Sequence, residues 1–250
     1  MSITLTPIES GKMTADKGAL CEGAQGDATF PVCCWVISHP KGTVLFDTGL
    51  HNELKSNKSR LGPSADVFAV DIPEGKDLVA LLAEKQFYAD KIDFVVLSHL
   101  HFDHCGGTAL IPNAQILIQE KEWQAGSDER MIELGVYNPN DFNLGHTVQQ
   151  VDGEFDIFGD GSVVCLPTPG HTAGHQSLRI ELTSGPVVLT SDCVYWQQML
   201  EDMSFPPFGF DREQQRESML NLIKLRKEGC NLIFGHDALQ WASLKNKVMS

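Results

Sequence analysis

The chain has 250 residues, of which 42% are hydrophobic and 21% are charged, so it has the composition of a folded globular protein and not of a disordered one. It carries 33 acidic and 19 basic residues, and the formal net charge is −14. An acidic protein is disfavoured as a binder of nucleic acid or of anionic membrane surfaces, because both present negative charge to their partners.

Short runs rich in Val, Ile and Phe predict a succession of β-strands, since each run is bounded by Gly, Pro, Asn, Asp or Ser. In chain order the runs are Phe30–Ile37, Thr43–Phe46, Phe94–Leu97, Gln115–Ile118, Val163–Leu166, Leu178–Leu182, Val187–Thr190 and Leu232–Phe234. With helices between them, these strands predict an α/β protein. We expect residues 1–250 to form a single domain.

Apolar residues at helical spacing predict three helices, over Asp77–Phe87, Asp211–Glu228 and Ala238–Val248. Asp211 is expected to cap the N-terminus of the second helix. Two polar stretches, Asn52–Pro73 and Gly126–Thr147, are predicted to be long loops. Loops of this length are uncommon in a compact domain and are often functional.

The N-terminal residues lack the basic start and apolar stretch of a secretory signal, and no apolar run is long enough to cross a bilayer. The seven cysteines are scattered, without a CxxC pair. This pattern is typical of free thiols in a reducing compartment. We therefore expect a cytoplasmic protein with no membrane partner.

The run from Ser98 to Gly107 contains a dense set of metal-ligating side chains directly after a predicted strand. They are His99, His101, Asp103 and His104. In an extended chain, residues 99, 101 and 103 would lie on one side. Imidazole and carboxylate ligands suit zinc, iron, cobalt or manganese better than calcium or magnesium. The run therefore predicts a transition-metal site.

Three more candidate ligands each follow a predicted strand directly, next to a small residue: His171, Asp192 and His236. If those strands share a sheet edge, their ends converge on the same site. Asp47 also ends a strand and is expected to accept a hydrogen bond from a ligating histidine. We expect the other candidates to be locally bonded, structural or buried residues and not ligands, namely His39, His51, His146, His175, Cys105 and Cys193.

Together these residues resemble, in type and order, the metallo-β-lactamase superfamily. Within it, the chain is most similar to the N-acyl homoserine lactonases, the quorum-quenching lactonases. That closer likeness rests on the run 98–104, the run Thr168–Leu178, the placement of Tyr195 three residues after Asp192, and the run Phe234–Asp237. The resemblance implies an αββα sandwich, in which two mixed β-sheets pack face to face with helices outside.

The resemblance also implies two divalent metal ions, zinc first, with cobalt, iron or manganese as alternatives. It assigns one ion to His99, His101 and His171, the other to Asp103, His104 and His236, and makes Asp192 the bridge. A hydroxide shared by the ions would attack the carbonyl carbon of a lactone. Asp103 would then move the proton to the leaving oxygen, and Tyr195 would donate a hydrogen bond to the developing oxyanion.

The sequence thus predicts a hydrolase that opens the ring of N-acyl homoserine lactones, acting as a monomer or homodimer on a small-molecule substrate and not on nucleic acid. We expect the acyl pocket to include Phe102, Tyr195, Trp196 and Met199. Other substrates remain open: another lactone, such as one of the pyridoxine pathway, or a thioester or phosphodiester. β-Lactam hydrolysis is disfavoured, because Asp192 stands where class B enzymes have a cysteine.

Overall fold

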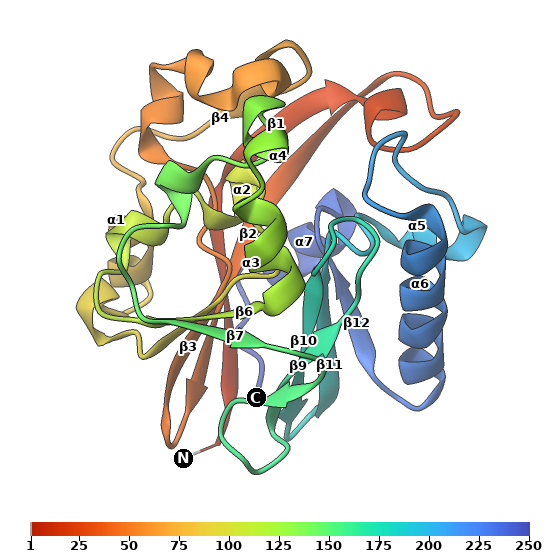
Figure 1. The fold of residues 1–250 in the computed structure, drawn as a ribbon. Helices are drawn as coiled ribbons and strands as arrows, with labels where there is room; N and C mark the ends of the chain where they lie inside the picture. Colours follow the sequence, from red (N-terminus) through yellow and green to blue (C-terminus); the bar gives the residue numbers. More distant parts are fainter. Residues whose placement is uncertain (1) are drawn as a thin grey trace.

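Two β-sheets pack face to face, with helices on their outer faces (Figure 1). The computed structural model describes residues 2–250. The first sheet has seven strands in the order β4-β1-β2-β3-β5-β6-β7, and the second has five in the order β12-β11-β10-β9-β8. Both sheets are mixed. In the first, the neighbours from β4 through β1 and β2 to β3 are antiparallel, and those from β3 through β5 and β6 to β7 are parallel. In the second, the neighbours from β8 through β9 and β10 to β11 are antiparallel, and β11 and β12 are parallel. The expected αββα sandwich is confirmed.

The strands of the first sheet are β1 (Thr4–Asp16), β2 (Asp27–His39), β3 (Gly42–Phe46), β4 (Ala69–Asp71), β5 (Phe94–Val96), β6 (Gln115–Gln119) and β7 (Val148–Val151). Those of the second are β8 (Phe155–Asp156), β9 (Val163–Pro167), β10 (Gln176–Leu182), β11 (Gly185–Ser191) and β12 (Asn231–Phe234). The helices are α1 (Leu78–Glu84), α2 (Phe102–Cys105), α3 (Glu120–Gly126), α4 (Glu129–Glu133), α5 (Gln197–Asp202), α6 (Arg212–Lys227) and α7 (Ala238–Leu244).

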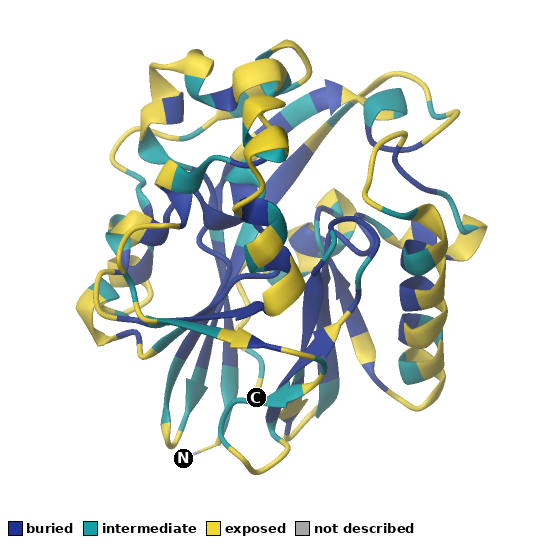
Figure 2. Ribbon diagram, in the orientation of Figure 1, coloured by how far each residue is buried: buried dark blue, intermediate teal, exposed yellow. Residues whose placement is uncertain are grey.

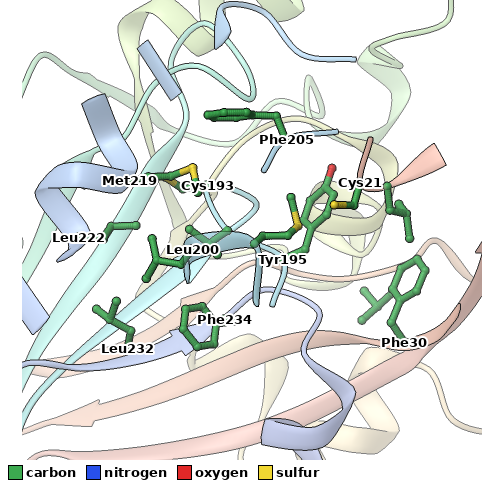
Figure 3. Packing of buried hydrophobic residues seen from close by; sticks show 14 of the residues in the cluster. Cys21, Phe30, Cys193, Tyr195, Leu200, Phe205, Met219, Leu222, Leu232 and Phe234 are labelled. Carbon is green, nitrogen blue, oxygen red and sulfur yellow. The ribbon is translucent and has the colours of Figure 1, made fainter. Parts of the chain in front are cut away.

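Three apolar clusters stabilise these layers, and Figure 2 shows the buried strands between the exposed outer surfaces of the helices. The cluster between the sheets includes Phe46, Leu178 and Ile233. A second cluster lies between the first sheet and α1. A third lies between the second sheet and α6 and extends through α5 to Phe30 of β2 (Figure 3). Burying one face of each sheet and the apolar face of each helix produces the four layers.

Every predicted strand is confirmed within a few residues, but four strands were missed: β4, β7, β8 and the long strand β1. The sequence of β1 contains Pro7 and Gly11, which have low strand propensity, and its long antiparallel pairing with β2 outweighs that propensity. The helix predicted to reach Val248 ends at Leu244. The reason is that Met249 and Leu5 exchange two backbone hydrogen bonds of 2.9 and 3.0 Å, which draws the C-terminal residues into an extended conformation.

The two stretches predicted to be loops contain short ordered elements. Residues 52–73 contain 3₁₀ turns over Asn52–Lys55 and Lys58–Asp66 and then β4, while residues 126–147 contain α4 and a 3₁₀ turn over Pro139–Asp141. Polar side chains start these turns: Asn57 accepts from the N–H of Ser59, and Asp128 from that of Arg130. Sequence periodicity does not detect elements this short.

No helix of residues 2–250 combines the length and the apolar character needed to cross a membrane.

Asp211 caps α6 as expected, since its carboxylate accepts hydrogen bonds from the N–H groups of Glu213 and Gln214 at 2.9 and 3.0 Å. Replacing it by alanine leaves both groups without this acceptor. We expect Asp211→Ala to lower the free energy of unfolding by about 0.5–2 kcal/mol, measured by urea denaturation. Glu217→Ala, an exposed position in the same helix, is the control; an equal loss there would contradict the capping role.

Candidate metal centre

One end of the sandwich collects the polar residues that follow the strands. Asp47 follows β3 and His99 follows β5, and these two strands are parallel neighbours. Asp192 follows β11 and His236 follows β12, again parallel neighbours, in the other sheet. The amide N–H of Gln176 donates to the carbonyl of Ser98 at 2.9 Å and joins the two sheets at this end. Residues distant in sequence therefore meet.

The predicted ligands form two groups. Within each group the donor atoms lie within 4.8 Å of one another, so each group could hold a metal ion. The first contains His99, His101, His171 and Asp192, and the second contains Asp103, His104 and His236. The expectation that 99, 101 and 103 share one side is wrong for Asp103. The chain turns into α2 at Phe102, and this turn carries Asp103 to the second group.

Asp192 lies between the two groups, and each of its carboxylate oxygens faces one of them. Its Oδ2 is 3.8 Å from Nε2 of His99 and 3.4 Å from Nε2 of His171. Its Oδ1 is 3.3 Å from Nε2 of His104 and 3.1 Å from Nε2 of His236. This is the arrangement of a carboxylate that can bind two cations at once.

Hydrogen bonds on the outer side of the rings orient three of the histidines. Nδ1 of His99 lies 3.0 Å from Oγ of Ser98, and Nδ1 of His236 lies 2.9 Å from the carbonyl oxygen of Pro31. Nδ1 of His104 lies 2.9 Å from Oδ2 of Asp47, which is the hydrogen bond expected of Asp47. Each contact fixes the ring and turns its Nε2 toward the cluster.

Charge interactions within the buried cluster are strong. Burial holds the pKa of His99 and of His171 well below the ordinary value, so both imidazoles are neutral and keep a free lone pair. Burial would also lower the pKa of His104, but the carboxylates of Asp192, Asp103 and Asp47 outweigh it and raise that pKa well above its usual value. The carboxylates therefore concentrate negative charge where a cation is stabilised.

The donor set fits a pair of metal ions. Nε2 of His104 and Oδ1 of Asp192 are buried and have no hydrogen-bond partner in residues 2–250, although both face the cluster. Buried polar atoms without partners are rare, and a cation would satisfy these two. Five imidazoles and two carboxylates are the ligands that zinc and its neighbours in the periodic table prefer.

The residues predicted not to be ligands lie outside both groups. His39 and His51 bond to nearby polar groups, and Nε2 of His146 lies 3.0 Å from the carbonyl of Ile111. His175 is buried and its Nδ1 lies 2.9 Å from Oγ1 of Thr168. Burial raises the pKa of the thiols of Cys105 and Cys193, so both stay protonated.

An apolar pocket of about 470 Å³ opens directly above the cluster. At its base lie His101, Asp103, Asp192 and His236. Its sides are mainly apolar, with Met13, Leu20, Phe30, Phe68, Phe102 and Phe208 among them. A pocket with reactive groups at the base and apolar walls suits a substrate with a polar head and a hydrocarbon tail.

Of the four residues expected in this pocket, Phe102 and Tyr195 line it and two do not. Trp196 lines a neighbouring cavity on the far side of Phe30 and His236, because the chain turns after Tyr195 into α5. Met199 is 1% exposed and belongs to the buried cluster of Figure 3, where Tyr195 packs near Leu200. Tyr195, Trp196 and Met199 are close in sequence, but they lie at the pocket, at a second cavity and in the buried core, respectively.

Glu122 was not identified from the sequence, although it ties together the two loops that carry the candidate ligands His99, His101 and His171. It is fully buried on α3. Its Oε1 accepts from the N–H of Leu100 at 3.1 Å, and its Oε2 accepts from the N–H of Gly174 at 2.9 Å. Leu100 lies between His99 and His101, and Gly174 belongs to the loop of His171. A buried glutamate within a helix pattern carries no sequence signal of this role.

Glu122→Ala leaves two buried N–H groups without an acceptor, at about 1–3 kcal/mol each. We expect the free energy of unfolding to fall by about 2–6 kcal/mol, measured by urea denaturation. Glu120→Ala, at an exposed position of the same helix, should change stability far less. Equal effects at the two positions would show that Glu122 does not join the loops.

Residues 28–236 match the family model described as the metallo-beta-lactamase superfamily. The chain belongs to this superfamily. N-acyl homoserine lactonase AttM of Azorhizobium caulinodans is 31% identical, over 97% of this chain and 96% of that protein. N-acyl homoserine lactonase AiiA of Bacillus thuringiensis subsp. kurstaki is also 31% identical, over 86% of this chain and 84% of that protein.

Solved structures of superfamily members have the same fold. One is an N-acyl homoserine lactone hydrolase with the product N-hexanoyl-L-homoserine at its catalytic metal centre, with a TM-score of 0.86, 29% identity and 97% of both chains covered. Another is a variant of B. thuringiensis AiiA with N-decanoyl-L-homoserine at the active site, with a TM-score of 0.86, 28% identity and the same coverage.

Proposed function

We propose that this protein is a metal-dependent hydrolase that opens the lactone ring of N-acyl homoserine lactones. The observation that carries the proposal is the placement of Asp192 between two groups of metal-ligating side chains at the base of an apolar pocket. The near full-length similarity to proteins named N-acyl homoserine lactonase supports the same substrate class. The natural role would be quorum quenching.

In this proposal, His99, His101 and His171 would hold one ion, Asp103, His104 and His236 would hold the other, and Asp192 would contribute to both. We propose zinc for both, because imidazole and carboxylate donors in buried sites suit it. When bound, the ions would supply Lewis acidity and lower the pKa of water to near neutrality.

Asp103 is proposed as the group that moves the proton. It lines the pocket and is 5% exposed, so a substrate can reach it. Burial alone would raise its pKa, but the neighbouring His104 and His236 outweigh burial and lower it, so the carboxylate is ionised and can accept a proton. It would take that proton from the attacking water and give it to the ring oxygen that leaves.

Tyr195 is proposed to stabilise the carbonyl oxygen as it gains negative charge. Its ring lies 5.8 Å from that of His171 and 5.5 Å from that of His236. Burial, together with the charges of Asp192 and Asp103, raises the pKa of its hydroxyl well above the usual value. The hydroxyl therefore stays protonated and is a hydrogen-bond donor.

The apolar walls are proposed to bind the acyl tail and to exclude water from the reacting carbonyl. The rings of Phe68 and Phe102 are 5.9 Å apart and form one side, and Phe208 lies above His171 at 6.1 Å.

We further propose that residues 1–250 act as one domain in the cytoplasm, without nucleic-acid or membrane partners. Seven free cysteines and the charge of −14 support this.

The direct test measures hydrolysis of candidate substrates by the purified protein with zinc restored, and a pH-stat records the acid that is released. We expect hydrolysis of hexanoyl- and decanoyl-homoserine lactone, and loss of activity after chelation and in Asp192→Ala. An unsubstituted γ-lactone and a phosphodiester are the comparison substrates. If neither acyl homoserine lactone is opened by protein with bound metal, the proposed substrate is wrong.

Tyr195→Phe removes the proposed donor and keeps the ring. We expect kcat on hexanoyl-homoserine lactone to fall by about 10²–10³, while the metal content, measured by mass spectrometry, stays the same. An unchanged kcat would assign Tyr195 to packing alone.

A further inference from the structure

The outer side of the pocket is formed by two stretches of chain that are far apart in sequence. We call residues 52–73 the first wall segment and residues 126–147 the second wall segment. In Figure 1 the first, in orange, lies beside α4 of the second, in green. The first contributes Pro63, Ser64, Val67 and Phe68 to the lining, and the second contributes Leu134, Gly135 and Val136.

The two wall segments touch where they line the pocket. A Cβ atom on Gly135 would lie 2.5 Å from Cδ of Pro63, and Gly135 has a φ of +71°. Only glycine accommodates both the close approach and this backbone conformation. This contact is apolar and contains no hydrogen bond.

An ion pair joins the segments behind this contact. Nη2 of Arg60, in the first wall segment, donates to Oδ1 of Asp141, in the second. Among the hydrogen bonds of residues 2–250, it is the only one that joins the two segments. Nη1 of Arg60 also donates to Glu53 at 3.2 Å, which fixes the guanidinium within its own segment.

The pair is shielded from water on both sides. The side chain of Asp141 is 2% exposed and that of Arg60 is 15% exposed. Removing one member of a buried pair leaves an uncompensated charge, so the two stretches are expected to separate rather than keep that charge buried. Neither Arg60 nor Asp141 lines the pocket itself.

We propose that the Arg60–Asp141 ion pair clamps the two wall segments together and thereby sets the preference for long acyl tails. The inference rests on the proposed function. The ligand groups lie on other elements at the base of the pocket, so the lactone head is bound independently of the clamp. Binding of the acyl tail depends on the clamp, because each methylene group that the walls bury raises the affinity about fourfold.

The test uses Asp141→Asn, which keeps the side-chain shape and removes the charge. We expect the ratio of kcat/KM for decanoyl-homoserine lactone to that for an unsubstituted γ-lactone to fall about tenfold. Turnover of the unsubstituted γ-lactone should stay within about twofold, because it has no tail. The matched control is Glu133→Gln, an exposed carboxylate of the second wall segment outside any ion pair of residues 2–250, and its ratio should not change.

Hydrogen–deuterium exchange gives a second readout that needs no substrate. Asp141→Asn should speed amide exchange in residues 58–68 and in residues 131–137, and Glu133→Gln should not. An unchanged exchange rate in either segment, an unchanged ratio, or an equal fall for both lactones overturns the clamp. If the wild-type protein opens no acyl homoserine lactone, the proposed function fails, and the exchange data still decide whether the ion pair holds the segments.

Discussion

The structure depends on keeping buried carboxylates and imidazoles in contact with one another at the junction of two sheets. Ionised groups are costly to bury unless opposite charge lies close by. Asp192 satisfies this condition toward both sheets, because one of its oxygens faces His171 and the other faces His104 and His236. A metal pair placed among these donors would balance the same charge.

That requirement explains several features that have no direct part in the chemistry. Asp47 holds His104 by one carboxylate oxygen and accepts from the N–H of Ser98 with the other at 2.7 Å. Its φ of +58° lies in the left-handed region, where residues other than glycine are uncommon. Gln176 donates both from its backbone and from its side chain to carbonyls near the end of β5. Such contacts fix the distance between the sheets and hence the spacing of the candidate ligands.

The polar base and the apolar walls of the pocket come from different parts of the fold. The base lies at the ends of buried strands, where the backbone is rigid. One side of the walls lies on strands β1 and β2, through Met13 and Phe30, and the outer side lies on the two wall segments, whose 3₁₀ turns and short helix are joined to each other by one hydrogen bond of residues 2–250. This separation allows the reacting groups to stay fixed while the shape of the tail pocket is set by contacts such as that between Arg60 and Asp141.

Much of the site could be predicted because its residues are placed by local rules. Apolar runs bounded by turn residues located the strands, and polar side chains directly after them identified His171, Asp192 and His236 as candidates. Periodicity failed at Asp103, because α2 is too short to give a helical pattern. The expectation for Trp196 and Met199 was also wrong, since the chain turns after Tyr195 into α5, which places Trp196 at a neighbouring cavity and Met199 in the buried apolar cluster.

By itself, the sequence determined the fold class, most of the strands and the identity of the candidate ligands, because strand propensity and metal-ligating chemistry are properties of single residues and their neighbours. Only the tertiary structure decided which glutamate ties together the two loops of candidate ligands and which ion pair joins the pocket walls. Those relations join residues far apart in the chain, as from Glu122 to Gly174 or from Arg60 to Asp141. They arise when the two sheets pack and their strand ends meet.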